Sequence, residues 1–368
     1  MGYDADVLIV GGGPAGLAAA IAARAKGLAV MVADGANPPI SKPCGEGLLP
    51  DSVSALRKLG VALGPTDGHV LRGICFADRA VSVRGEFRGT PGLGVRREVL
   101  HRRMVERAEE CGVSLLWNSP VTGLTDSGAV VAGNKVCARW VIGADGIRSR
   151  VRRWAGLEDV QQCGSRFAWR QHYRAKAWSD SIEVHWNEHA QAYVTPVGAE
   201  EICVALIANR PNVRVSQTLH KFPALARRLA AAQRANTERG AITSMCALRR
   251  VSHGRVALVG DASGTVDAIT GQGLSLGFQQ ALVLADALKR GHLEHYQREH
   301  RQLARRPRFM ANLLLFLGRR HAVRKRTFRA LQAAPNLFEC MVAYHVGETR
   351  PFELAATGAQ FSWRFLTA

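Results

Sequence analysis

Apolar positions near the N-terminus fall into two short runs separated by a helical stretch. Residues 6–10 read DVLIV and residues 28–33 read LAVMVA, and the alanine-rich residues 14–26 lie between them. Short apolar runs next to glycine are typical of buried strands, and two parallel strands need a crossover that is usually a helix. The pattern therefore predicts a βαβ unit at the start of the chain.

Elements of the same kind follow further along the chain. Helical periodicity predicts a helix over 97–111, and short alternating runs predict strands within 113–142. VIGADG (141–146) and RVALVGDASG (255–264) each read as a buried strand that enters a glycine-rich turn. We expect helices over residues 271–289 and over most of residues 293–345.

The middle of the chain has a different periodicity. Between residues 160 and 210, segments such as SIEVHW (181–186) and EICVALI (201–207) predict antiparallel strands with one covered face. We expect this sheet to form a second domain that is inserted into the first. The fold class is therefore α/β, with segments of two domains interleaved along the chain.

Composition adds few constraints on function. The chain has 368 residues, of which 47% are hydrophobic and 21% charged, as in ordinary globular proteins. Its eight cysteines are scattered and form no CxxC pair, so no metal site is expected. Scattered cysteines and the absence of a signal peptide or a long apolar run favour a cytoplasmic protein.

The charge is strongly basic and unevenly placed. The net charge is +19, and 13 basic residues against two acidic ones lie between Lys289 and Arg329. We expect no nucleic-acid binding, because no aromatic platform or known motif accompanies these charges. The basic run is either a solvated helix face or a surface for peripheral contact with an anionic membrane. The sequence does not indicate an oligomeric state.

A glycine-rich turn between the first strand and helix fits the pattern GxGxxG. It is followed by Asp34 at the end of the next strand, which completes a dinucleotide fingerprint. Gly11 allows the tight turn, Gly13 lets a pyrophosphate approach the helix N-terminus, and Gly16 allows close packing. The predicted nucleotide contacts are Gly11, Gly13, Pro14, Ala15, Gly16 and Asp34.

Three further motifs carry a resemblance to a known family. They are GADGIRSRVRR (143–153), LVGDASGTVDAITGQGLSLGFQQA (258–281) and RREVLHRRMVERA (96–108). In this order they resemble motifs of the FAD-dependent oxidoreductases with the p-hydroxybenzoate hydroxylase fold, and within them the geranylgeranyl reductase-like branch. The resemblance implies FAD as cofactor, with contacts from Gly45, Arg97, Val121, Asp145, Gly260, Asp261, Gly271, Gln272, Gly273 and Leu274.

The resemblance also implies the domain plan. It implies a Rossmann-like FAD-binding domain with a parallel sheet, interleaved with a mostly antiparallel substrate-binding sheet and followed by C-terminal helices. The expected boundaries are 1–72, 96–158 and 251–290 for the FAD-binding domain, 73–95 and 159–250 for the substrate domain, and 291–368 for the helices. Independently of the family, a helix that begins at Gly271–Gly273 would place its positive end beside the flavin.

The reaction is less well defined than the cofactor. Only one dinucleotide fingerprint is present, so we expect NAD(P)H to visit the flavin without its own Rossmann domain. A flavin halogenase is disfavoured, because its tryptophan motif is absent. The segment AYVTPVG (192–198) resembles the substrate segment of the reductase branch, with Tyr193 and Pro196 as candidate substrate contacts.

Two departures from the family motifs bear on the type of reaction. Gly264 matches the reductase-like branch, whereas Ala268 replaces the proline of aromatic hydroxylases. We rank NAD(P)H-dependent monooxygenation of a small aromatic or lipophilic molecule slightly above reduction of an alkene. A flavin-binding scaffold without turnover is the non-enzymatic alternative.

The loop SKPCGEGL (41–48) supplies the catalytic candidates. It resembles the cysteine-containing segment beside the flavin in the reductase-like branch. Cys44 either contacts flavin or substrate, as a proton donor or a polarisable wall, or only shapes the loop with a small side chain. Glu46 either hydrogen-bonds within the flavin site or is a solvated loop residue. No other cysteine lies near Cys44 in the sequence, so a disulfide is not expected.

Overall fold

A computed structural model describes residues 2–78, 81–211, 213–349 and 358. Its first half is built on a sheet whose path runs β18-β19-β11-β1-β2-β8, and β19, β11, β1, β2 and β8 are parallel. The predicted βαβ unit is confirmed as β1 (Ala5–Val10), α1 (Pro14–Ala25) and β2 (Val30–Ala33). The other strands are β8 (Ser114–Leu116), β9 (Val121–Thr125), β10 (Gly128–Val131), β11 (Asn134–Gly143), β18 (Ser252–His253) and β19 (Val256–Leu258).

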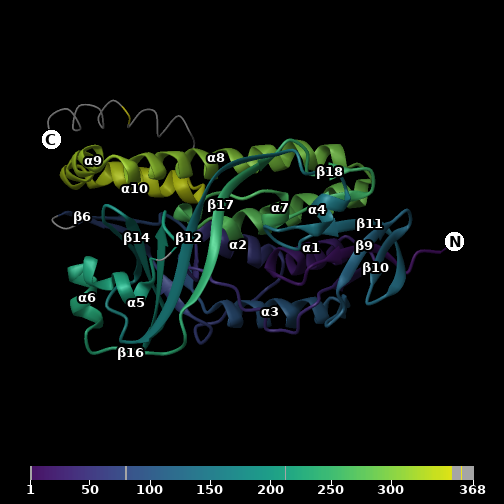
Figure 1. Cartoon of the computed structure of the whole chain (residues 1–368), viewed down its shortest axis with the longest axis horizontal. Helices are drawn as coiled ribbons and strands as arrows, with labels where there is room; N and C mark the ends of the chain where they lie inside the picture. The colour runs from purple at the N-terminus through teal and green to yellow at the C-terminus, as the bar shows by residue number, and fades with distance from the viewer. Residues whose placement is uncertain (1, 79–80, 212, 350–357, 359–368) are drawn as a thin grey trace.

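The second large sheet is mainly antiparallel and forms the other half of the molecule (Figure 1). Its order is β16-β12-β15-β14-β13-β5-β6, and β17 pairs with β12. The hairpin β5–β6 comes from an early part of the chain and joins through parallel pairing of β5 with β13. The strands are β5 (Gly73–Asp78), β6 (Val81–Glu86), β12 (Val160–Arg174), β13 (Ser181–Trp186), β14 (Ala190–Gly198), β15 (Glu201–Ala208), β16 (Gln233–Arg234) and β17 (Arg239–Leu248).

A small third sheet includes the end of the loop SKPCGEGL (41–48). Strand β3 (Gly47–Leu48) pairs with β7 (Gly92–Gly94), which also pairs with β4 (His69–Leu71). The loop that contains Cys44 therefore ends in a fixed strand pair. The two large sheets confirm the α/β fold class with a parallel and an antiparallel part.

Helices cover both sheets, and α8 extends beside both halves of the molecule (Figure 1). The helix predicted at 97–111 is α3 (Arg97–Glu110). The helix predicted from residue 271 is α7, which starts at Gly273 because Gly271 has left-handed backbone (φ 66°) and belongs to the preceding turn. The others are α2 (Pro50–Lys58), α4 (Arg150–Trp154), α5 (Val215–Thr218), α6 (Pro223–Leu229), α8 (Leu293–Arg319), α9 (His321–Ala333) and α10 (Pro335–Val346).

Two of the hydrophobic clusters matter for the site. One packs α1, α3 and α7 against the parallel sheet, and it fixes the ends of the strands from which the nucleotide motifs start. The other packs α8, α9 and α10 against β5, β6 and β13 of the antiparallel sheet. Among the described residues, no helix is both long and apolar enough to cross a membrane.

Candidate flavin site and adjoining cavity

The glycine turn after β1 has two packed positions and one open position. A Cβ atom on Gly11, which has φ 111°, would lie 2.5 Å from the carbonyl oxygen of Ala144, and one on Gly16 would overlap the Gly11 carbonyl oxygen. Among the described residues, no atom other than those of Gly13 and its two chain neighbours lies within 4 Å of a Cβ built on Gly13. Gly11 and Gly16 therefore serve packing, whereas Gly13 leaves free space at the N-terminus of α1, beside Pro14, for a phosphate group.

Asp34 supports this turn from the end of β2. Its carboxylate accepts hydrogen bonds from the backbone N–H of Gly12 (2.7 Å) and of Ala36 (2.8 Å). On the other side, buried His101 lies 2.9 Å from the Gly12 carbonyl oxygen through Nε2. Burial lowers the pKa of His101, which favours the neutral ring, so Nε2–H is the donor of this bond. The contact of Asp34 with a ribose stays a prediction, as does that of Val121, which is buried at the start of β9.

The motif around Asp261 lies directly against the turn. Gly260 has φ 62°, and a Cβ atom there would come within 2.5 Å of Cβ of Ala15. The Asp261 side chain is exposed, yet the surrounding protein desolvates it and raises its pKa, and nearby Lys42 and Arg97 oppose that rise. Arg97 is 9% exposed, and its Nε has no hydrogen-bond partner within the part of the chain that the structure describes. The three segments thus bring a carboxylate and two cations together beside α1.

The start of α7 is open toward the same region. Cβ atoms on Gly271, Gly273 and Gly45 would meet no atom of the described residues within 4 Å, neighbouring backbone aside. Leu274 is half-buried, whereas Gln272 is 1% exposed and donates from Nε2 to the carbonyl oxygen of His345 (2.6 Å). The Gln272 side chain therefore anchors the turn, and its cofactor contact stays a prediction. The open glycines and the unpartnered Arg97 Nε fit a bound FAD.

The Asp145 carboxylate has a structural role that the sequence did not indicate. It accepts hydrogen bonds from Ser149 Oγ (2.5 Å) and from the N–H groups of Arg150 (2.7 Å) and Val151 (3.1 Å). These bonds satisfy donors in the first turn of α4. A contact between Asp145 and the cofactor stays a prediction.

Glu46 is buried and held by ionic and hydrogen-bonding partners. It is 2% exposed, so the solvated-loop interpretation is wrong. Oε1 accepts hydrogen bonds from Arg170 Nη1 (2.7 Å) and from the backbone N–H of Arg97 (3.0 Å), and Oε2 lies 2.5 Å from His172 Nε2. Burial alone would raise the pKa of Glu46, but His172, Arg97 and Arg170 together lower it. Glu46 is therefore an ionised group inside the protein.

The hydrogen-bond pattern also assigns the proton on His172. The Asn236 side-chain oxygen accepts from the backbone N–H of His172 (3.2 Å), so its amide nitrogen is the group 2.6 Å from His172 Nδ1. The Asn236 amide donates to Nδ1, and the ring proton is therefore on Nε2, facing Glu46. The loop before β3, which contains Glu46, is therefore hydrogen-bonded to β12.

The structure brings a second cysteine close to the backbone of Cys44, and both thiols are free. Sγ of buried Cys203 on β15 lies 3.7 Å from the Cys44 carbonyl oxygen. Desolvation raises the pKa of Cys203 well above its usual range, and the Glu46 charge raises it further. Cys44 itself is half-buried, and its sulfur accepts a hydrogen bond from the N–H of Glu46 (3.3 Å).

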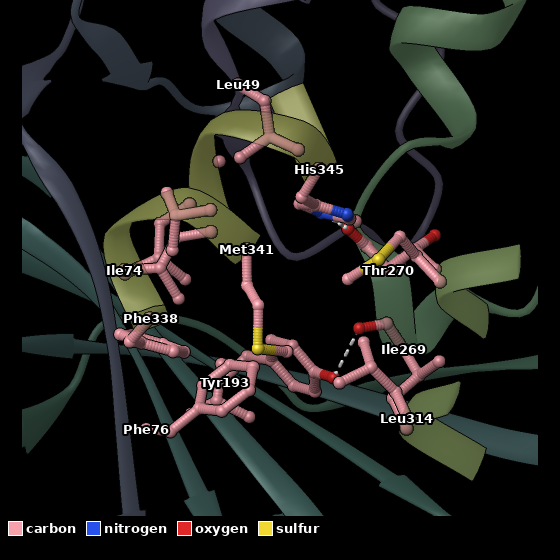
Figure 2. A pocket seen from close by; sticks show the side chains of 16 residues that line it. Leu49, Ile74, Phe76, Tyr193, Ile269, Thr270, Leu314, Phe338, Met341 and His345 are labelled. Carbon is pink, nitrogen blue, oxygen red and sulfur yellow. Dashed lines mark hydrogen bonds between the residues drawn. The ribbon is translucent and has the colours of Figure 1, made fainter. Parts of the chain in front are cut away.

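An apolar cavity of about 590 Å³, including its open mouth, adjoins these loops (Figure 2). Strands of the antiparallel sheet form one wall, α8 and α10 form the other, and Gly47 and Gly271 connect it to the two candidate flavin loops. Figure 2 shows Tyr193, Met341 and Leu314 around this space. Other lining residues are Leu49, Ile74, Phe76, Ile182, Val184, Ile269, Thr270, Met310, Phe338, Val342 and His345.

Two polar side chains of the cavity hold the segment before α7. Tyr193 donates from its hydroxyl to the Ile269 carbonyl oxygen (2.7 Å), and His345 Nε2 lies 2.9 Å from the Thr270 carbonyl oxygen. Burial lowers the pKa of His345 to about 4, so the neutral ring donates this bond. Tyr193 thus lines the cavity, whereas Pro196 is buried and is not one of the lining residues. Direct substrate contact by either residue stays a prediction.

Sequence reasoning missed Arg170, His172, Cys203 and His345. A signal existed for the first two, because Arg170 and His172 alternate along a strand and so share one face of a sheet. Charged and polar groups at such positions indicate either an exposed face or a buried polar site. No comparable signal marked His345, which lies at the C-terminal end of an otherwise apolar helix.

This combination of glycine-lined cofactor space and adjoining apolar cavity is that of an FAD-dependent oxidoreductase. Residues 4–306 match the family described as "FAD binding domain", and the chain belongs to that family. A solved flavoprotein/dehydrogenase from Cytophaga hutchinsonii has the same fold, with a TM-score of 0.83 at 18% identity over 97% of this chain and 96% of that one.

Sequence relatives act on several substrates. Menaquinone reductase from Mycolicibacterium smegmatis is 30% identical over 80% of this chain and 79% of its own. Digeranylgeranylglycerophospholipid reductase 1 from Methanopyrus kandleri is 30% identical over 73% of this chain and 76% of its own. Ubiquinone hydroxylase from Rhodospirillum rubrum is 28% identical over 77% of this chain and 72% of its own.

Proposed function

We propose that this FAD-dependent oxidoreductase reduces a carbon–carbon double bond in a lipophilic, isoprenoid-type substrate, with NAD(P)H as electron donor. The observation that carries the proposal is the apolar cavity beside Gly271. Its lining is aliphatic and aromatic apart from Tyr193, Thr270 and His345, and Tyr193 and His345 are bonded to backbone carbonyl groups. Such a space favours an apolar chain over a polar ring.

This proposal reverses the order favoured by the sequence alone, in which monooxygenation ranked first. Two of the three relatives described above are reductases named for substrates with isoprenoid chains. Hydroxylation of a quinone-type molecule is the second candidate, and the ubiquinone hydroxylase relative favours it. The same cavity would suit either reaction.

We assign the cofactor contacts by extending the site geometry described above. The turn at Gly13 and the α1 N-terminus would hold the pyrophosphate, and Asp261 and Arg97 would hold the part nearer the flavin ring. The N-terminus of the 18-residue helix α7 would stabilise negative charge there. When bound, FAD supplies the two-electron chemistry.

The protein has to supply a proton and exclude water. Saturating a double bond adds one hydride, which carries both electrons, and one proton. Cys44 is the candidate donor, because its half-buried thiol lies in the loop that leads to cavity residue Gly47. Ionised Glu46 is held by Arg170 and His172, so we assign it the role of positioning this loop.

A product analysis tests the proposal. Purified protein with FAD would be incubated with NADPH and either a menaquinone or a geranylgeranyl lipid, with and without oxygen. Reduction predicts a product with two added hydrogens that forms without oxygen, whereas hydroxylation predicts one added oxygen atom that requires it. A lack of turnover on every isoprenoid substrate, with turnover on a small polar aromatic acid, would contradict the lipophilic assignment.

A further inference from the structure

The outer side of α8 exposes two large aromatic side chains. Phe309 is 49% exposed and Phe316 is 51% exposed. They are seven residues apart, which is close to two helical turns, so they lie on the same side of the helix. Phe309 also packs edge-on against Tyr344 of α10, with ring centroids 5.9 Å apart, which holds it in place.

Basic residues extend this side of α8 toward its N-terminus. By helical periodicity, exposed Arg298 and Arg305 align with the two phenylalanines. These four residues are called the outer face of α8 below. No aspartate or glutamate occurs between residues 300 and 338. The face therefore combines two exposed aromatic rings with positive charge.

The opposite side of the same helix lines the cavity. Met310 and Leu314 follow Phe309 by one and five positions, and both contribute to the cavity wall. One helix thus separates the outer face from the proposed substrate space. Such proximity favours a partner that could itself contain a lipophilic substrate.

We propose that the outer face of α8 binds the surface of an anionic lipid bilayer, with Phe309 and Phe316 inserted between the lipids and the arginines at the headgroups. Amphipathic surfaces with aromatic residues and arginine are suited to this position. A second copy of the chain is a poorer partner, because pairing two such faces would bring like charges together. The argument from proximity rests on the proposed lipophilic substrate, whereas the argument from the exposed rings and arginines does not.

The test is sedimentation of FAD-loaded protein with vesicles in the absence of substrate. We expect binding to phosphatidylglycerol vesicles at low ionic strength, little binding to phosphatidylcholine, and release by salt. Phe309→Ser combined with Phe316→Ser should weaken binding by about 30-fold, since about half of each ring loses its burial in lipid. Arg298→Gln combined with Arg305→Gln should weaken it by a similar factor of about 30.

Matched variants separate this face from general effects. Val70→Ser removes another exposed apolar side chain (44% exposed), and Arg57→Gln with Lys58→Gln removes two charges from α2. Both control variants should bind vesicles with an affinity within about twofold of the wild type, because the apolar area and the charges they remove lie outside the outer face of α8. Equal loss in controls and α8 variants would overturn the proposal, as would a lipid-free dimer abolished by the phenylalanine changes. Failure of turnover on isoprenoids would leave these outcomes unaffected.

Discussion

Glu46 combines two unfavourable features in one residue. Its backbone is in the left-handed region (φ 59°), which is uncommon outside glycine, and its charged side chain is buried. Partners from two distant segments compensate for this, namely Arg170 and His172 on β12 and the first N–H of α3. The conformation of the candidate flavin loop therefore depends on this carboxylate.

Changing Glu46 to Gln should destabilise the protein strongly. Arg170 is 2% exposed and would lose its ionic partner, which for a buried pair costs about 3–5 kcal/mol of unfolding free energy. Urea unfolding checks this. Glu98→Gln, which breaks a half-buried and solvent-accessible pair with Arg96, is the control and should cost at most about 1 kcal/mol. Equal effects of the two changes would show that the buried pair does not hold the fold.

Cys44 can be tested against Cys203. If Cys44 is the proton donor, Cys44→Ser should retain FAD and slow turnover by about tenfold or more, with Cys44→Ala at least as slow. Cys203→Ser should leave the rate near that of the wild type, since this thiol is buried in the sheet. Steady-state rates of these variants on an accepted substrate distinguish a proton donor from a loop-shaping residue. Normal rates for both Cys44 variants would leave a loop-shaping role, and parallel loss in Cys44 and Cys203 variants would indicate a thiol pair.

At the scale of elements, the nucleotide-binding turn was the part most readily predicted from sequence. Its strand, turn, helix and following strand are contiguous, so local spacing was sufficient to place Gly11, Gly13 and Gly16. The cavity was not predictable in this way. Its walls combine β5, β13, α8 and α10, which are far apart in the chain, and their contact depends on strand order and helix packing. The Glu46–Arg170 pair was missed for the same reason.

Two glycine substitutions in the turn should have different effects. Gly13→Val should give folded protein without FAD. The backbone of Gly13 (φ −70°, ψ 174°) can accommodate valine, but the valine side chain would fill the space that we assign to the pyrophosphate. Gly16→Ala should reduce the yield of folded protein, since its Cβ would overlap the Gly11 carbonyl oxygen. Flavin absorbance and circular dichroism separate the two results. If the Gly13→Val protein were yellow and active, the turn would not be part of the cofactor site.

At the scale of the whole molecule, buried histidines link the C-terminal helices to the cofactor segments. His300 of α8 lies 2.9 Å through Nε2 from the hydroxyl of Ser263, just after Asp261, and His345 of α10 holds Thr270. Burial lowers the pKa of each ring to about 4. Protonation of either ring is therefore coupled to the attachment of the helical layer.

The pH dependence of stability follows from these values. In the unfolded chain a histidine has a pKa of about 6.5, so between about pH 6.5 and pH 4 the unfolded state binds more protons than the folded state. Unfolding free energy should fall as pH falls through this range, by roughly 2 kcal/mol per histidine at about pH 4.5. Urea titrations at several pH values check this. His300→Gln or His345→Gln should flatten the slope.

Helix α8 has the cavity on one side and exposed phenylalanines on the other. If the outer side lies on a bilayer, the substrate would move within the lipid plane and would never be dissolved in bulk water. The rate would then follow the mole fraction of substrate in the membrane rather than its amount per unit volume of solution. Adding inert lipid at constant substrate would slow the enzyme by surface dilution, even though every component remained present at the same bulk concentration.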